Sequence, residues 1–248
     1  MIRPAPSALS AFLLCGALAP LVGCAAASPL PDPDRHALLR SFEGKVLFLR
    51  TSLNVLPFFA DDTRHLASPL HADSIHLLDD TKGVPIMPGA VVQVIPLGTK
   101  VRIEKVEFPT GLVVSRRPLY TPRDNPWVYL ALPGFPRGRP FVVVLRQGMT
   151  TGDDYRAALN DLFSDDEPSL WMRNVSAEIR RAIEEKRLVA GMDAEQVMLS
   201  WGRPEHIRQT LEAGVRLETW TWPLKKRTAT LRDGKLAAAA PPLESAAP

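Results

Sequence analysis

The sequence has almost no cysteine. Its 248 residues contain two, Cys15 and Cys24, and both lie close to the N-terminus. No disulfide can therefore cross-link the residues that follow, and no cysteine-based metal or redox site can form among them. The folded part has to be stabilised by burial of apolar side chains. A chain of this length with 46% hydrophobic residues is long enough to do so.

Sequence motifs of catalysis are also missing. There is no G-x-S-x-G elbow, no H-E-x-x-H pair, no phosphate-binding glycine loop and no C-x-x-C pair. The acidic pairs Asp153-Asp154 and Asp165-Asp166 lie at expected helix ends, where capping accounts for them. We therefore predict no enzymatic activity and no cofactor. A carboxylate pair of the glycosidase type stays open, because a sequence does not show how far apart two carboxylates lie.

A strong charge of either sign is absent as well. The net charge is +3 and the basic residues are spread along the chain, so we predict no nucleic-acid partner. Residues 58–83 contain His65, His71 and His76 among several aspartates, which are ligand types for zinc. Their spacing matches no compact ligand motif, and we interpret residues 58–83 as a long polar loop or hairpin without a metal.

Long hydrophobic runs are limited to the N-terminus. Leu9 to Leu21 is apolar but too short for a stable membrane span, and it follows the basic Met1-Ile2-Arg3. It ends in Leu21-Val22-Gly23-Cys24, which resembles the bacterial lipobox. The resemblance implies a signal peptide over residues 1–23, lipidation of Cys24, and transfer to the outer membrane because Ala25 is not aspartate. The alternative is an ordinary secretory signal cut near Ala25–Ala27.

The proline-rich residues 24–41 that follow predict a flexible tether. Residues 42–149 then read as a β-rich domain. Short strands are predicted at residues 44–50, 90–95, 100–108, 127–132 and 141–146, with no helices between them. This pattern predicts a small antiparallel barrel or sandwich. Gly44-Lys-Val-Leu-Phe-Leu-Arg50 and Pro96-Leu-Gly-Thr99-Lys-Val-Arg-Ile-Glu resemble the Src-homology-like β-barrels of bacterial envelope proteins.

Residues 150–240 predict helices followed by a small sheet. One helix is expected from Thr151 to Phe163, and another from Ser169 or Asn174 to Arg187. Asp193 and Gln196 form a capping box for a third, which Gly202 ends in a left-handed conformation. Two hairpins follow, with turns at 212–214 and Asp233-Gly234. Residues 241–248 are expected to be a disordered tail.

The third helix and first hairpin carry a family resemblance. Gly191-Met192-Asp193, Gln196-Val197, Gly202-x-Pro204 and Glu218-x-Trp220 resemble the BamE/SmpA–OmlA pattern of small outer-membrane lipoproteins. The resemblance covers residues 174–236 and implies two or three helices packed on a small antiparallel sheet, hence an α+β fold overall. The sequence departs from the pattern at Asp193, where threonine or serine is usual, and at Trp201, where leucine is usual.

The candidate binding residues of this region are Trp201, Arg203, Trp220 and Trp222, because tryptophan is enriched in interface hot spots. The alternative is that Trp220 and Trp222, on one face of a strand, pack against Trp201 and Val197 as core. The basic run Lys225-Lys226-Arg227 is read as a solvated loop rather than a site for anionic lipid.

These patterns predict a lipid-anchored outer-membrane lipoprotein that faces the periplasm. It would act as a non-enzymatic binding or scaffold protein of the cell envelope, with a membrane contact through the lipid and an envelope protein as partner, in outer-membrane protein assembly or elsewhere. Two alternatives remain: a module that binds peptidoglycan or another envelope ligand, and an envelope hydrolase.

Overall fold

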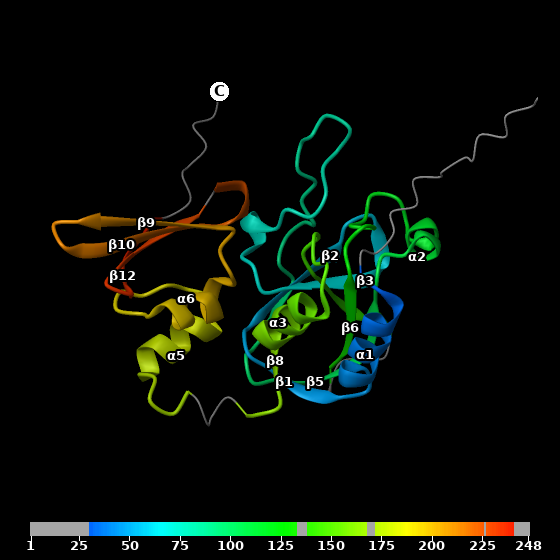
Figure 1. The fold of residues 1–248 in the computed structure, drawn as a ribbon, viewed down its shortest axis with the longest axis horizontal. Coiled ribbons are helices and arrows are strands. Elements are labelled where there is room, and N and C mark those ends of the chain that lie inside the picture. Colours follow the sequence, from blue (N-terminus) through cyan, green and yellow to red (C-terminus); the bar gives the residue numbers. More distant parts are fainter. Residues whose placement is uncertain (1–29, 133–137, 168–171, 226, 241–248) are drawn as a thin grey trace, which may run out of the picture.

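Two separate β-sheets and the helices packed on them make up the described part of the chain, which confirms an α+β fold. The structure is a computed structural model, and it describes residues 30–132, 138–167, 172–225 and 227–240. The larger sheet has the strand order β4-β2-β3-β7-β6-β5-β1-β8, and the smaller one the order β12-β11-β10-β9 (Figure 1). None of the helices among the described residues is long and apolar enough to cross a membrane.

The larger sheet is mixed rather than antiparallel throughout. Its strands are β1 (Val46–Leu49), β2 (Leu53–Phe58), β3 (Asp61–Ser68), β4 (Gln93–Ile95), β5 (Lys100–Glu107), β6 (Trp127–Ala131), β7 (Phe141–Val144) and β8 (Phe163–Ser164). The one parallel pair is β3 with β7, in the middle of the sheet. All other neighbouring strands pair antiparallel.

The sheet is rolled, although it does not close. Strands β2 and β1 are five positions apart in the order, which in a flat sheet would separate them by about 24 Å. Four residue steps join Leu49 to Leu53, and they reach at most about 14 Å. The sheet must therefore curl until its two ends come near each other. Two hydrogen bonds join Leu49 of β1 to the β4–β5 turn: Gly98 N donates to Leu49 O at 2.7 Å, and Leu49 N donates to Thr99 O at 3.0 Å. The prediction of a small antiparallel barrel or sandwich is wrong, because the described residues form one mixed sheet with a parallel pair, and its edges β4 and β8 are not joined into a barrel. The expectation of no helices between the strands is also wrong, because α2 (Gly111–Arg116) lies between β5 and β6.

Of the two interpretations of residues 58–83, a long polar loop or a hairpin, β3 excludes the loop, since it pairs antiparallel with β2 in a hairpin inside the sheet. Residues 61–68 form the central strand β3, and β2 was not predicted at all. Leu53, Val55, Leu56 and Phe58 of β2 are buried on both faces of the sheet, so the strand lacks the apolar–polar alternation that marks a half-exposed strand. Pro57 also interrupts it, and the pairing with β3 is irregular at that point.

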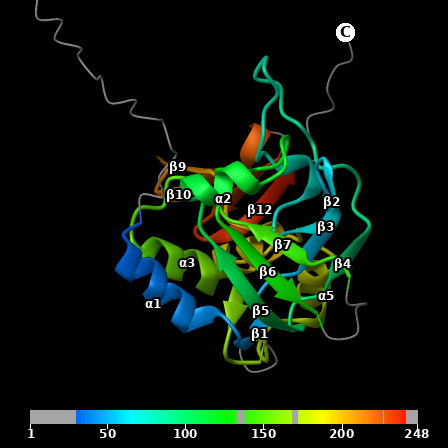
Figure 2. The ribbon, with the colours of Figure 1, turned by 90° about the vertical axis from the view of Figure 1, so that its right-hand side faces the viewer.

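Helix α1 (Asp32–Phe42) corrects the predicted tether from residue 32 onward, whereas residues 24–29 of that prediction lie outside the described residues. Pro31 and Pro33 precede and open the helix, where the missing N–H of proline does no harm, and Asp32 and Asp34 suit its N-terminal dipole. Leu30 and Leu38 are fully buried. Helix α1 lies beside α3 (Gly152–Leu162) over the sheet (Figure 2), and both contribute to one core. The predicted signal peptide at 1–23, Cys24 and the tail at 241–248 lie outside the described residues.

The C-terminal part confirms most of the local predictions, but the second predicted helix is shorter than expected, and its alternative start at Ser169 lies outside the described residues. Helix α3 begins at a Thr151 capping box. The later elements are α5 (Ala177–Glu184), α6 (Ala194–Trp201), β9 (His206–Glu212), β10 (Val215–Thr221), the short 3-10 helix η2 (Pro223–Lys225), β11 (Thr228–Arg232) and β12 (Lys235–Ala240). Asp193 and Gln196 form the expected capping box. Gly202 ends α6 at φ 79 and ψ 177, a region essentially restricted to glycine rather than the left-handed helical conformation predicted.

Arg227 joins the C-terminal part to the segment that follows β3 of the larger sheet. Its guanidinium binds both carboxylate oxygens of Asp73, in the 3-10 helix η1 (Ala72–Ser74), at 2.8 and 3.1 Å, and His71 Nε2 at 3.0 Å. It also lies 4.8 Å from the ring centroid of Trp201. Burial and Arg227 lower the pKa of His71, so a neutral ring can accept from Arg227 and donate from Nδ1 to Asp73. The reading of Arg227 as solvated is wrong.

Lys186 and Gly202 complete this junction between the two parts. The ammonium of Lys186 is buried and donates to Ser52 O at 2.9 Å, while its carbonyl accepts from Trp201 Nε1 at 3.0 Å. A Cβ on Gly202 would lie 3.1 Å from Leu70 Cδ2 and 3.3 Å from Pro69 O. Glycine at position 202 therefore both ends α6 and allows the two parts to approach closely.

The buried Lys186 makes stability depend on pH. Burial lowers its pKa from 10.5 to about 7, so between these values the unfolded chain holds one proton more than the folded chain. The free energy of unfolding should then rise with pH over this range, by about 1.4 kcal/mol per pH unit from this group. Urea unfolding at several pH values should show that Lys186→Met loses this increment and that Lys45→Met, at an exposed position, keeps it. Parallel pH profiles for wild type and Lys186→Met would contradict the assignment.

Candidate functional site

The tryptophans predicted to bind a partner are core residues. Trp201, Trp220 and Trp222 are all buried in one apolar cluster with Val197, and the rings of Trp201 and Trp222 pack edge to face with centroids 5.2 Å apart. This confirms the packing alternative and corrects the prediction of a tryptophan binding surface. Arg203 is exposed and pairs with Asp161 at 2.8 Å, which places it at the junction.

The histidines of residues 58–83 are also dispersed into local contacts. His65 stacks on Phe141, His71 pairs with Asp73, and His76 pairs with Asp79 at 2.7 Å. In the part of the chain that the structure describes, no group of three or more histidine, cysteine or acidic residues is placed to hold a metal ion.

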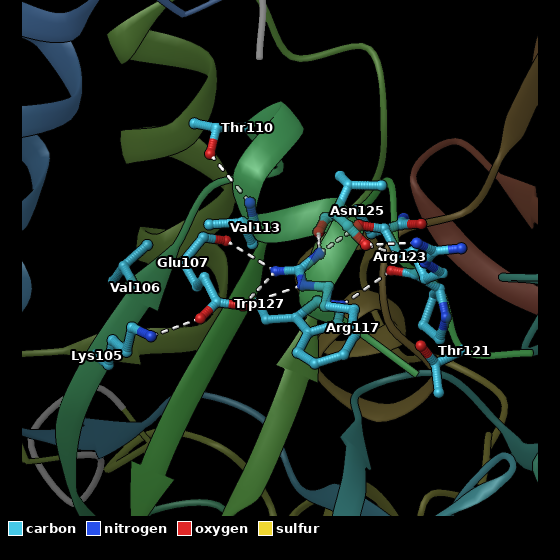
Figure 3. A network of polar contacts seen from close by, with 12 residues as sticks. Lys105, Val106, Glu107, Thr110, Val113, Arg117, Thr121, Arg123, Asn125 and Trp127 are labelled. Carbon is cyan, nitrogen blue, oxygen red and sulfur yellow. Dashed lines mark hydrogen bonds and ion pairs between the residues drawn. The ribbon is translucent and has the colours of Figure 1, made fainter. Parts of the chain in front are cut away.

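A rigid loop of residues 117–126 presents a surface that the sequence did not reveal. The loop runs from the end of α2 (Gly111–Arg116) to the start of β6, and Arg117 at its beginning is buried, with a side chain only 3% exposed. Figure 3 shows the Arg117 guanidinium between the carboxylate of Glu107, the loop carbonyls and the ring of Trp127. These groups come from the end of β5, from the loop itself and from the start of β6.

The contacts of Arg117 use both its charge and its planar shape. Nε donates to Glu107 Oε1 at 3.0 Å, Nη1 donates to Asn125 O at 2.6 Å, and the guanidinium carbon lies 3.8 Å from the Trp127 ring centroid. A planar, always charged group with several donors suits such a site, and lysine would not. Arg117 therefore ties the loop to two strands of the sheet.

The charge of Glu107 is maintained by its partners. Burial alone would raise its pKa, but hydrogen bonds from Lys105 and Arg117 bring the pKa below the usual 4.5. The pair consequently contributes its stabilisation above pH 4.5 and loses it as the pH falls through the lowered pKa. Burial in turn lowers the pKa of Arg117, and Glu107 opposes that shift.

Further hydrogen bonds hold the rest of the loop. Arg123 donates to Val114 O at 2.6 and 3.1 Å, and Trp127 Nε1 donates to Pro122 O at 2.9 Å. Asn125 Nδ2 donates to Leu145 O at 2.8 Å and Asn125 Oδ1 accepts from Gln147 at 3.0 Å. The loop is therefore fixed at both ends and in its middle.

At its tip this braced loop exposes apolar side chains. Leu119 and Tyr120 are 66% and 64% exposed, and Leu112 of the adjoining α2 is 62% exposed. Tyr120 has φ 57, a conformation that costs a residue with a bulky side chain about 1–3 kcal/mol and persists only when its surroundings enforce it. A strained, exposed aromatic on a rigid loop is a feature of recognition surfaces.

Beside the loop lies a cleft of about 230 Å³. It is lined by Leu77 and Leu78 on one side and by the 119–125 loop and Gln147 on the other. Apolar side chains and the polar groups of Thr121, Asp124 and Asn125 meet in it, so the cleft can take a short peptide-like segment or a side chain. No sequence pattern indicated this site, because residues 77–78 and 119–125 meet only through the fold.

A larger cleft of about 400 Å³ lies where the β4–β5 turn approaches α5. Its lining carries charges of both signs, from Glu167, Arg173, Arg180 and Glu184. Arg180 already donates to the carbonyl of Met172 at 3.2 Å. The cleft also adjoins residues 168–171, which lie outside the described residues, and the 119–125 surface is therefore the better defined site.

Removal of the Arg117 guanidinium should release the loop. Arg117→Met leaves Glu107 partly unpaired and two loop carbonyls without donors, so we expect a loss of about 3–5 kcal/mol in the free energy of unfolding. Arg117→Lys should recover little of it, because an ammonium cannot reproduce the planar contacts. Urea denaturation measures both. Arg116→Met, at the exposed neighbouring position, should stay within about 0.5 kcal/mol of wild type. Equal losses of stability at positions 116 and 117 would contradict the role of Arg117 in holding the loop.

Comparison with known proteins adds no family to these observations. Neither the protein-family models, nor the curated proteins, nor the solved structures contain a match to the chain. The resemblance of residues 174–236 to BamE/SmpA–OmlA lipoproteins therefore stays a prediction, and so does the lipidation of Cys24.

Proposed function

We propose that the protein is a lipid-anchored outer-membrane lipoprotein that acts as a non-enzymatic docking protein on the periplasmic side of the envelope. The docking role depends on one observation: the buried Arg117 braces a loop that exposes Leu119 and Tyr120 beside a cleft. The anchor depends on the lipobox-like Leu21-Val22-Gly23-Cys24.

Rigidity of the loop supports docking on energetic grounds. A segment that is ordered before binding loses less conformational entropy when its partner arrives, so more of the contact energy appears as affinity. Exposed leucine and tyrosine side chains supply apolar contact area, and the polar groups of the cleft can orient a bound segment through hydrogen bonds. An extended segment of an envelope protein fits this combination.

The length of the anchor supports the same proposal. The first described residue, Leu30, is buried, and six residue steps separate it from Cys24. Six steps span at most about 22 Å. A lipid on Cys24 would then keep the folded body within that distance of the bilayer, where the effective concentration of membrane-bound partners is high and a modest interface is sufficient.

Fatty-acid labelling tests the anchor. The full chain, expressed in a Gram-negative host with a labelled fatty acid, should incorporate label and fractionate with outer membranes. Cys24→Ala should lose the label and leave the membrane fraction, because several acyl chains at about 0.8 kcal/mol per buried CH₂ would be gone. Cys15→Ala is the matched control and should keep the label. Labelling of Cys24→Ala to the wild-type level would refute the anchor.

Co-purification tests the docking surface. A tagged full-length chain, solubilised from outer membranes, should enrich an envelope protein. The double change Leu119→Ser and Tyr120→Ser should reduce that enrichment by about thirty-fold, which corresponds to the loss of one hot spot of about 2 kcal/mol. Stability should stay unchanged, because both side chains are exposed. Val46→Ser removes an apolar side chain of β1 that is 54% exposed and should have no effect.

Equal enrichment by the double variant would place docking elsewhere. Retention of the wild-type chain on purified cell-wall sacculi, with no protein enriched, would instead favour the peptidoglycan-binding alternative.

A further inference from the structure

Strand β9 forms an open edge of the smaller sheet. The order β12-β11-β10-β9 puts it at one end, and no strand lies beyond it among the described residues. All seven of its residues, His206 to Glu212, are exposed. The opposite edge is different, because residues 191–193 cover β12: Gly191 N bonds Leu236 O at 2.9 Å and Leu236 N bonds Met192 O at 2.7 Å.

The hairpin turn determines which backbone groups of β9 face outward. Strand β9 pairs with β10 from Glu212 opposite Val215 to His206 opposite Thr221. The two turn residues, Ala213 and Gly214, both have positive φ, at 48 and 81, as in a two-residue type I′ turn. In such a turn the flanking residues Glu212 and Val215 form a hydrogen-bonded pair, and every second residue of β9 from Glu212 onward is hydrogen-bonded to β10 in the same way. The N–H and C=O groups of Ile207, Gln209 and Leu211 are therefore directed away from β10.

The sequence of β9, HIRQTLE, is complementary to itself when read antiparallel about Gln209. In that register Gln209 lies opposite Gln209 of a second copy, and Ile207 lies opposite Leu211. Ile207, Gln209 and Leu211, whose free backbone groups point outward, then lie opposite Leu211, Gln209 and Ile207 of the second copy. Two copies can exchange six backbone hydrogen bonds without a change in either hairpin.

Apolar side chains match on one face of this pairing. Ile207 lies opposite Trp220 within the hairpin, so Ile207, Gln209 and Leu211 are on the face of the sheet that packs on the helices. Ile207 and Leu211 are 50% and 75% exposed, beyond the area that the helices cover. In the self-paired register Ile207 of each copy covers Leu211 of the other. Apolar cross-strand pairs of this kind stabilise a sheet.

Charges match on the other face. His206 lies opposite Glu212 of the second copy, and Arg208 lies diagonal to the same carboxylate. Among the described residues, neither Arg208 nor Glu212 has an ion-pair partner within its own chain. No like charges lie directly opposite each other in this register; Arg208 is diagonal to Arg208 of the second copy as well as to Glu212, and the two Glu212 carboxylates offset the two guanidinium charges. β9 also lacks the lysine and proline residues that commonly protect an open edge from pairing.

We propose that β9 is the interface of a symmetric dimer, in which two copies of this chain join edge to edge and form a continuous eight-stranded sheet. A two-fold axis through Gln209, perpendicular to the sheet, generates the partner and keeps the helices of both copies on one face. The inference is independent of the partner that the 119–125 surface binds.

Disulfide trapping in membranes tests this register on the full chain. In Gln209→Cys the two new cysteines face each other, with Cα atoms about 5.5 Å apart, within the limit of about 7 Å for a disulfide. In the matched control Glu212→Cys, six residue steps separate the two cysteines by about 20 Å. Under mild oxidation, Gln209→Cys should give a homodimer band on a non-reducing gel in at least about tenfold the yield of Glu212→Cys.

A second pair of variants tests the apolar face. Ile207→Lys with Leu211→Lys, added to Gln209→Cys, should reduce the dimer yield about tenfold or more. Circular dichroism and the melting temperature should be unchanged, because both side chains are exposed in the single chain. Equal yields from positions 209 and 212, an unaltered yield in the lysine variant, or a cross-linked band with the mass of a different protein would overturn the proposal.

Discussion

Two arginines that lie over tryptophan rings, the buried Arg117 and the partly buried Arg227, hold polar segments of this chain in place. Arg117 lies 3.8 Å from the Trp127 ring centroid and Arg227 lies 4.8 Å from that of Trp201, and each pairs with a carboxylate, Glu107 or Asp73. The attraction of the ring for the cation is about 2 kcal/mol when both are desolvated. Its larger effect is on geometry, because a buried guanidinium has to satisfy several donors at once and so tolerates only one arrangement of its neighbours.

These cations explain how polar segments can be ordered without a core of their own. The loop of residues 117–126 and the short helix η1 bury little apolar surface, yet both are positioned by a carboxylate or carbonyls that bind an arginine. Removing the cation would leave its buried acceptors unpaired, which costs more than the pair contributes. The same reasoning applies to Lys186, whose single acceptor, Ser52 O, lies in the other part of the chain.

Local signals in the sequence were sufficient for the C-terminal part but not for the larger sheet. Asp193 with Gln196 and the Asp233-Gly234 turn define their elements within a few residues, and the structure has them there. The position of β2 was not predictable in this way, because a strand buried on both faces has no alternation and Pro57 argues against it. The roll of the sheet, the parallel pair of β3 with β7, and the contacts of Arg227 with His71 and Asp73 all join residues distant in sequence. A single sequence carries no signal for such contacts.

The two surfaces assigned here lie at opposite ends of the molecule. Figure 1 places α2, next to the 119–125 loop, at one end of the longest axis and β9 at the other. A partner on one surface therefore does not obstruct a second copy on the other. Their relative orientation depends on the junction, where the lack of a side chain at Gly202 lets the C-terminal part approach Pro69 and Leu70, and where Arg227 and Lys186 bind acceptors across the gap. If the junction were loose, two copies paired through β9 would hold their 117–126 loops in no defined arrangement. Because it is packed and hydrogen-bonded, a dimer formed through β9 would present two loops at a constant separation, and bivalent binding benefits only when such a separation matches the partner.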